Sequence, residues 1–207
     1  MNPMKTQATR NGAAVLFIVA VALFRLCTAF TASGGHLPWL ENFAPVAAVA
    51  LCGGIYLPRR VAFIIPVAAL LVSDLVLNWH YNAPLLSWEM ASRYAAIALT
   101  VGIGFGLRNR ARLSLILPAS VLGSLIFYVV TNTTSWLGTA AYAKTLAGWV
   151  QALTTGLPGY APTWTFYRST LLSDLLFTTL FVLCMSATAE PSFEIPASKF
   201  HLALQKR

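Results

Sequence analysis

Charged side chains are scarce in this 207-residue chain, since Asp, Glu, Lys and Arg make up only 10% of it. Soluble domains carry about 25% charged residues. With 57% hydrophobic residues and a mean hydropathy of +0.69, the composition excludes an ordinary soluble domain. We predict an all-α integral membrane protein that forms one membrane domain over residues 1–207, with no separate soluble domain.

Motifs for covalent catalysis and nucleotide hydrolysis are also missing. The chain has no catalytic nucleophile motif, no phosphate-binding glycine loop and no His-x-x-x-His pair. Cys27, Cys52 and Cys184 lie inside apolar runs without disulfide or metal-site spacing, and we interpret them as small buried residues. The sequence therefore does not predict an enzyme. A transporter of this kind would draw energy from a partner, an ion gradient or the solute's own gradient.

Six apolar runs predict membrane-spanning helices, each of which needs about 20 residues. The runs cover about residues 13–32, 42–58, 61–79, 91–107, 113–131 and 168–187. Glycines in these runs predict close helix packing, and they are Gly53, Gly54, Gly102, Gly104 and Gly106. Before the last run, residues 142–154 predict a short amphipathic helix in a long loop suited to a lid.

The cations alternate by loop, which predicts the orientation of the chain. Ten of the fourteen fall on one side of a six-span bundle: Lys5, Arg10, Arg59, Arg60, Arg108, Arg110, Arg112, Lys199, Lys206 and Arg207. This positive-inside pattern predicts that both termini are cytoplasmic, and we do not interpret the net charge as a nucleic-acid signal. A signal peptide is the alternative for the first run. Arg25 interrupts that run and no good Ala-x-Ala site follows, so we expect it to be retained.

The most informative polar stretch is Ser-Asp-Leu-Val-Leu-Asn-Trp-His-Tyr-Asn, residues 73–82. An acid inside a membrane span is costly and usually functional. Asn78 and Tyr81 follow Asp74 at i+4 and i+7, on the same helical face. We interpret this stripe as part of a polar site at the outer face of the membrane.

Ser-Asp-Leu recurs at 173–175, which also places Asp174 in the outer half of its span. The recurrence is consistent with a three-plus-three repeat. Two interpretations of the acids stay open. Asp174 forms a packing ion pair with Arg25 or Arg168, or Asp74 and Asp174 are the paired acids of a membrane-embedded enzyme.

Glu89 and Arg93 are four residues apart and can pair with each other on a helix. The predicted outer face also carries amide and aromatic side chains. These side chains suit a large amphipathic ligand with amide groups, and they are Asn42, Asn78, Thr131, Asn132 and the many Trp and Tyr residues on this side.

His80 lies between Trp79 and Tyr81 at the predicted end of the third span. It is either an interfacial residue of an aromatic belt or a metal ligand, since imidazole binds late first-row metals well. His36 and Glu41 lie on the same side without a recognised metal-site spacing, so we predict no free metal ion. A single protein ligand suits a metal that is already held by a macrocycle.

Three neighbouring segments carry a family resemblance. They are Asn-Phe-Ala-Pro-Val-Ala-Ala-Val-Ala-Leu-Cys-Gly-Gly-Ile-Tyr-Leu at 42–57, then Arg59-Arg60, then Ile-Pro-Val-Ala-Ala-Leu-Leu-Val-Ser-Asp-Leu at 65–75. Together they resemble the BtuM-type family of small bacterial membrane proteins, which are similar to the S-components of energy-coupling-factor vitamin transporters. The resemblance implies a six-helix bundle in the bacterial inner membrane, with an outer cavity that binds cobalamin for uptake.

The resemblance also implies a site. The family pattern places a cysteine as axial ligand to the corrin cobalt after the Asp-bearing helix, and this chain has no cysteine between 53 and 183. His80 is the expected substitute, which argues against thiolate-dependent chemistry because imidazole is a poorer reductant. The implied ligand-binding residues are Asp74, Asn78, His80, Tyr81, Arg93, Asn132 and Arg168.

Partners follow from the same resemblance. S-components that dock on a shared energising module resemble one another in an Ala-x-x-x-Ala pattern in the first helix, and no two alanines are four apart in this first run. We therefore expect a solitary protein whose partners are the corrinoid, the lipid membrane and a periplasmic donor. The runner-up is an S-component-like transporter for another vitamin, which a pocket too small for a corrin would favour.

Overall fold

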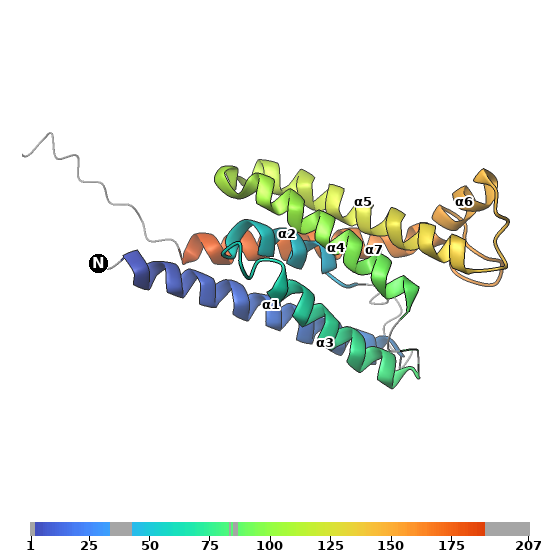
Figure 1. Ribbon diagram of the computed structural model, residues 1–207, viewed down its shortest axis with the longest axis horizontal. Helices are drawn as coiled ribbons and strands as arrows, with labels where there is room; N and C mark the ends of the chain where they lie inside the picture. The colour runs from blue at the N-terminus through green and yellow to red at the C-terminus, as the bar shows by residue number, and fades with distance from the viewer. Residues whose placement is uncertain (1–2, 34–42, 83, 85–86, 189–207) are drawn as a thin grey trace, which may run out of the picture.

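The computed structural model describes residues 3–33, 43–82, 84 and 87–188, and these residues form helices and connecting turns without strands (Figure 1). The all-α prediction is confirmed. The helices are α1 (Pro3–Ser33), α2 (Val46–Tyr56), α3 (Ile64–His80), α4 (Trp88–Leu107), the short 3-10 helix η2 (Arg108–Arg110), α5 (Leu113–Gly138), α6 (Leu146–Leu153) and α7 (Thr163–Ala187).

Each predicted span overlaps one of these helices, and the short helix predicted within 142–154 forms as α6. The ends differ from the prediction where polar residues continue a helix. The last helix begins at Thr163 rather than at 168, because Pro162 precedes it with a φ of −55° that suits a helix start. In α5, hydroxyls such as those of Thr131 and Thr134 donate to carbonyls one turn back, and the helix runs on to Gly138.

Four helical segments are long and apolar enough to cross a membrane: Ala8–Thr31, Trp88–Arg110, Leu113–Gly138 and Thr163–Ala187. The other two apolar helices are shorter. At a rise of about 1.5 Å per residue, the 11 residues of α2 extend only about 16 Å, against a hydrocarbon core of about 30 Å. Helix α2 is thus the shortest of the six apolar helices, and it lies in the middle of the bundle.

The helices form two groups that meet along α2 (Figure 1). The first group is α1 and α3, which pack on each other, and the second is α4, α5 and α7 around α2. The turns at one end carry Arg59, Arg60, Arg108, Arg110 and Arg112, and we call this the basic end. At the opposite end α3 stops, α4 and α7 begin, and α6 lies across the tip (Figure 1).

Polar and apolar side chains are distributed as expected for a protein in lipid. Large apolar side chains such as Leu16, Val72 and Leu183 are more than half exposed on the helix surfaces. The buried positions, by contrast, include hydroxyls and carboxylates: Ser73, Asp74, Thr100, Ser120, Ser124, Ser173, Asp174 and Thr178. Polar groups on packed helix faces that bond across helices are typical of membrane bundles.

Helices α2 and α4 cross with their backbones in contact. A Cβ atom on Gly54 would lie 2.5 Å from the carbonyl oxygen of Val101, and one on Gly104 would lie 2.5 Å from that of Leu51. The predicted close packing is confirmed at these positions. It is wrong for Gly102 and Gly106, where a Cβ atom would have no neighbour within 4 Å, because these two glycines face away from α2.

Charged side chains from neighbouring helices hold both ends of α2. At its start, Asp174 of α7 accepts hydrogen bonds from the amide of Ala48 at 2.8 Å and the hydroxyl of Ser124 at 2.6 Å. At its end, Arg108 donates to the carbonyls of Gly54 at 2.7 Å and Leu57 at 2.5 Å. A carboxylate at the N-terminus and a guanidinium at the C-terminus both complement the helix dipole.

Candidate functional site

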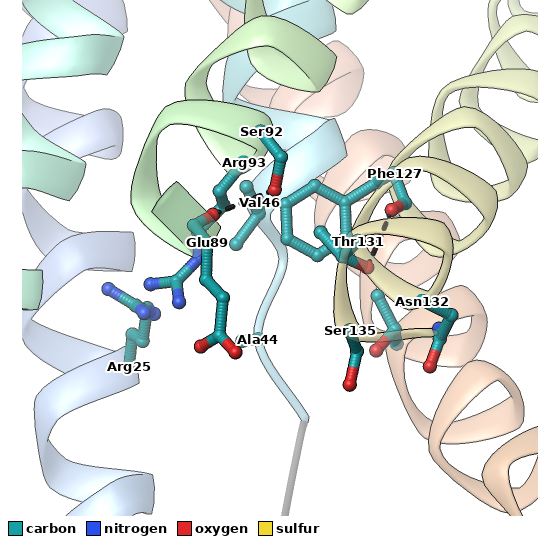
Figure 2. A pocket seen from close by; sticks show the side chains of 11 residues that line it. Arg25, Ala44, Val46, Glu89, Ser92, Arg93, Phe127, Thr131, Asn132 and Ser135 are labelled. Carbon is teal, nitrogen blue, oxygen red and sulfur yellow. Dashed lines mark hydrogen bonds between the residues drawn. The ribbon is translucent and has the colours of Figure 1, made fainter. Parts of the chain in front are cut away.

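A polar cavity of about 360 Å³ opens in the half of the bundle away from the basic end (Figure 2). It lies where α2 begins, so the short length of α2 makes the room for it. Its walls come from α1, the segment before α2, α4, α5 and α7. The lining residues are Arg25, Ala44, Val46, Glu89, Ser92, Arg93, Phe127, Thr131, Asn132, Ser135 and Thr170.

One wall is a pair of arginines that share a buried carboxylate. Asp74, whose side chain is 2% exposed, pairs with Arg25 of α1 at 2.5 Å and with Arg93 of α4 at 3.0 Å, both measured to its Oδ1 atom. The hydroxyl of Tyr94 donates to its other oxygen, Oδ2, at 2.9 Å, and Arg25 also donates to the hydroxyl of Ser73. One negative charge thus serves two guanidiniums, which leaves the wall with a positive surplus.

Glu89 brings a negative charge to the same cavity. It lies one turn before Arg93 on α4, and Figure 2 shows its carboxylate between the two guanidiniums and the α5 wall. No cation of the described residues comes within ion-pair distance of it. The predicted alternative of a Glu89–Arg93 pair is therefore wrong for the described chain, because Arg93 turns to Asp74 instead.

The wall opposite is neutral and polar. Thr131, Asn132 and Ser135 of α5 share one helical face at i, i+1 and i+4, and all three line the cavity (Figure 2). Hydroxyl and amide groups can donate and accept hydrogen bonds without adding charge. The cavity therefore combines a cationic surface, an isolated carboxylate and an uncharged polar surface.

A second cavity of about 370 Å³ adjoins the first, and Glu89 and Arg93 line both. Asn78, Ser87 and Thr134 are among its other lining residues. The amide of Asn78 donates to the carbonyl of Pro84 at 3.1 Å. Movement of the Glu89 and Arg93 side chains would join the two spaces.

The structure brings together only part of the predicted site. Arg93 and Asn132 line the first cavity, Arg93 and Asn78 line the second, and Asp74 lies behind the wall as the partner of Arg93. Tyr81 lies apart from them and donates to the carbonyl of Ala29 at 3.1 Å. Tyr81 keeps its helical spacing, since its amide donates to the carbonyl of Leu77 at 2.9 Å. The predicted stripe nevertheless does not line one space, because Asp74 and Tyr81 contact α1 while Asn78 lines the second cavity.

Two predicted ion-pair partners of Asp174 belong elsewhere. Arg25 pairs with Asp74 rather than Asp174, and the Arg168 guanidinium lies 6.0 Å from the ring centre of Trp164. Asp174 has the amide of Ala48 and the hydroxyl of Ser124 as its partners. That prediction was wrong because charge and depth alone do not show the direction in which a helical side chain points.

His80 lies at the end of α3, exposed, and outside the lining of both cavities. Its ring meets Phe30 edge-on at 4.8 Å and Tyr81 at 5.0 Å between ring centres. Among the described residues no three or more His, Cys, Asp or Glu side chains cluster as a metal site would require. His36, Glu41 and Asn42, which the sequence placed on the same side, lie outside the described residues.

Thr131, which was predicted to suit the ligand, lines the cavity beside Asn132. Other lining residues were not predicted as part of the site: Glu89, Ser92, Ser135 and Thr170. A spacing signal for most of them exists in the sequence. Glu89, Ser92 and Arg93 are spaced i, i+3 and i+4, which places three polar side chains on one helical face. The helical spacing of these polar residues shows that α4 and α5 each have a polar face, and both faces line the first cavity.

Comparison with known proteins identifies the family and no individual relative. No curated protein matches the chain, and no solved structure matches it. The model of a family described as being of unknown function, DUF6580, matches residues 5–196. The chain therefore belongs to the DUF6580 family.

Proposed function

We propose that this protein binds a small polar solute at the outer face of a membrane and takes it up. In this proposal the chain crosses the bacterial inner membrane six times, and α2 does so only together with the residues that flank it. Both termini and the basic end lie in the cytoplasm. The observation that carries it is the charged cavity near the opposite end. Arg25 and Arg93 are partly buried in an otherwise apolar bundle, where charged groups are costly. A solute that they bind, together with the exposed carboxylate of Glu89 beside them, accounts for their position.

Binding is favoured over catalysis by the state of the two buried acids. Asp74 is engaged by two guanidiniums and a hydroxyl, and Asp174 by a main-chain amide and a hydroxyl. The two carboxylates have no partner in common. A pair of acids acting together needs to face one reacting atom, so the enzyme alternative finds no support in this geometry.

The size of the cavity favours a small solute. Its volume of about 360 Å³ lies near the low end of the range of about 300–1,000 Å³ for small-molecule sites. A corrinoid is much larger than a ligand of that class. Cobalamin, which the family resemblance implies, is the second candidate, supported by the amide and hydroxyl wall and by the adjoining second cavity.

The proposal is tested by binding and then by uptake. The purified protein in detergent is heated with each of a panel of labelled water-soluble compounds (amino acids, organic acids, vitamins and cyanocobalamin), and a rise in melting temperature identifies the ligand. Proteoliposomes containing the protein should then take up that compound. Arg93→Gln should abolish both effects, whereas Arg168→Gln, a change at an exposed arginine outside the cavities, should preserve them. A protein that no compound stabilises would refute the proposal.

A further inference from the structure

Glu89 and Arg93 are positioned to pair on α4, and they do not. Opposite charges four residues apart on a helix ordinarily stabilise each other. Here the guanidinium of Arg93 lies 3.0 Å from Asp74 of α3, and the carboxylate of Glu89 projects into the cavity (Figure 2). The cavity is therefore lined by two opposite charges that do not pair with each other.

Arg25 and Arg93 have N–H donors that Asp74 does not use. A guanidinium has five N–H donors in a planar fork. Within the described part of the chain, Asp74 is the partner of Arg93, and its carboxylate is already shared with Arg25 and Tyr94. Arg25 and Arg93 both line the cavity, with side chains 13% and 28% exposed. A second carboxylate can reach this pair in the bidentate geometry that arginine prefers.

The glutamate side lacks a cation. Residues 34–42 and 83–86, which join α1 to α2 and α3 to α4 in the sequence, include no lysine or arginine. The remaining lining groups on the α5 wall, Thr131, Asn132 and Ser135, are neutral. Glu89 is exposed and lies in the first turn of α4, where the helix dipole favours an acid. No cation of the described residues pairs with its carboxylate, which can therefore bind a cationic group of a ligand in the cavity.

We infer that the ligand is a small zwitterion, with a carboxylate bound by Arg25 and Arg93 and a cationic nitrogen bound by Glu89. This inference rests on the proposed function and specifies its substrate class. The carboxylate takes the donors that Asp74 leaves, and the nitrogen supplies the missing partner of Glu89. The hydroxyl and amide wall of α5 accommodates the rest of an amino-acid-like molecule, within about 360 Å³.

The test separates the two charges of the ligand. Melting temperature and equilibrium binding are measured for the full chain with the twenty standard amino acids, β-alanine and γ-aminobutyrate. Each binder is then compared with its N-acetyl derivative, which lacks the cation, and with its carboxamide, which lacks the anion. We expect each derivative to bind about 10- to 100-fold more weakly, the usual effect of removing one hydrogen-bonded charge from a buried site.

Two variants assign the charges to residues. Glu89→Gln should weaken the free amino acid about 10-fold or more and leave the N-acetyl derivative unchanged, because that derivative has no cation to lose. Arg93→Gln should weaken the amino acid and leave its carboxamide unchanged. Arg168→Gln should alter none of these affinities, and the circular dichroism of all variants should match the native protein.

The outcomes separate this inference from the proposed function. Binding of an organic acid, a vitamin or cyanocobalamin with no amino acid bound would overturn the zwitterion and leave uptake of a polar solute standing. Equal affinity for an amino acid and its N-acetyl derivative would do the same. If nothing in either panel binds, both proposals fall.

Discussion

The carboxylate of Asp174 accepts a hydrogen bond from the main-chain amide of Ala48 at 2.8 Å, which joins the middle of α7 to the first turn of α2. Pro45 precedes α2 and makes no side-chain cap there. The first amides of a helix have no partner within the helix. A side chain from another helix therefore caps α2, and the cap is fully buried.

Asp174→Ala should lower the free energy of unfolding by about 2–4 kcal/mol, since it removes a charged acceptor from both Ala48 and Ser124. Ser124→Ala removes only one donor and should cost about 1 kcal/mol. Denaturation by SDS in mixed micelles gives both values. Equal losses for the two variants would show that Asp174 does not cap α2.

Arg108→Gln should also destabilise the protein, by about 1–3 kcal/mol, because the carbonyls of Gly54 and Leu57 lose their donor. Arg110, exposed in the same 3-10 turn, is the matched control. Arg110→Gln should change stability by no more than about 0.5 kcal/mol. The same micelle titration measures both, and a similar response of the two variants would contradict the role of Arg108.

Gly54→Ala and Gly104→Ala should each cost about 1–3 kcal/mol, because the added methyl group forces apart two backbones in contact. Gly102→Ala and Gly106→Ala, on the same helix α4, meet no atom within 4 Å. They should be neutral or stabilise by up to about 1 kcal/mol. Thermal unfolding followed by circular dichroism distinguishes the pairs, and no difference between them would rule out the crossing.

Asp74→Asn should destabilise the bundle by about 2–4 kcal/mol, because it leaves Arg25 and Arg93 facing each other without a counter-charge. The partial exposure of both arginines keeps the loss below that of a fully buried pair. Tyr94→Phe, which removes one hydroxyl donor to Asp74, should cost about 1 kcal/mol. Chemical denaturation measures the loss of unfolding free energy in both variants. A larger loss in Tyr94→Phe than in Asp74→Asn would contradict the role of Asp74 as the shared counter-charge.

The cobalamin prediction has its own spectroscopic test. If His80 is an axial ligand, the visible bands of hydroxocobalamin should shift on binding, and His80→Ala should remove the shift. Phe30→Leu, a change at the ring that contacts His80, should retain most of it. An unshifted spectrum with the native protein would exclude His80 as a cobalt ligand, and the small-solute proposal would be unaffected.

Helix positions were predictable from the sequence because long apolar runs are typical of helices buried in lipid or in the core. Each predicted span overlaps a helix, and α6 forms where an amphipathic helix was expected. The sequence also indicates that the second span is short, since Asn42, Phe43 and Ala44 precede Pro45 at its start. Residues from Val46 onwards continue an apolar run through Tyr56, and nothing in that run shows that α2 lies inside the bundle.

The partners of the charged residues were not predictable, for a geometric reason. Asp74 and Asp174 both lie in a Ser-Asp-Leu sequence, yet one is bound by arginines and the other by a main-chain amide and a hydroxyl. Which partner a side chain meets depends on how its helix is rotated and which helix lies beside it. Local spacing does establish shared faces, and the stripes of α4 and α5 show that the polar cavity could have been located more fully from it.

The position of Asp74 between the two helix groups has a mechanical consequence. Its carboxylate connects α3 to Arg25 of its own group and to Arg93 and Tyr94 of the other. A solute that binds the remaining donors of the same guanidiniums shares their positive charge with Asp74, so occupancy of the cavity and the spacing of α3 from α4 are thermodynamically linked. The guanidiniums of Arg25 and Arg93 would then both bind the solute and hold the two helix groups together through Asp74.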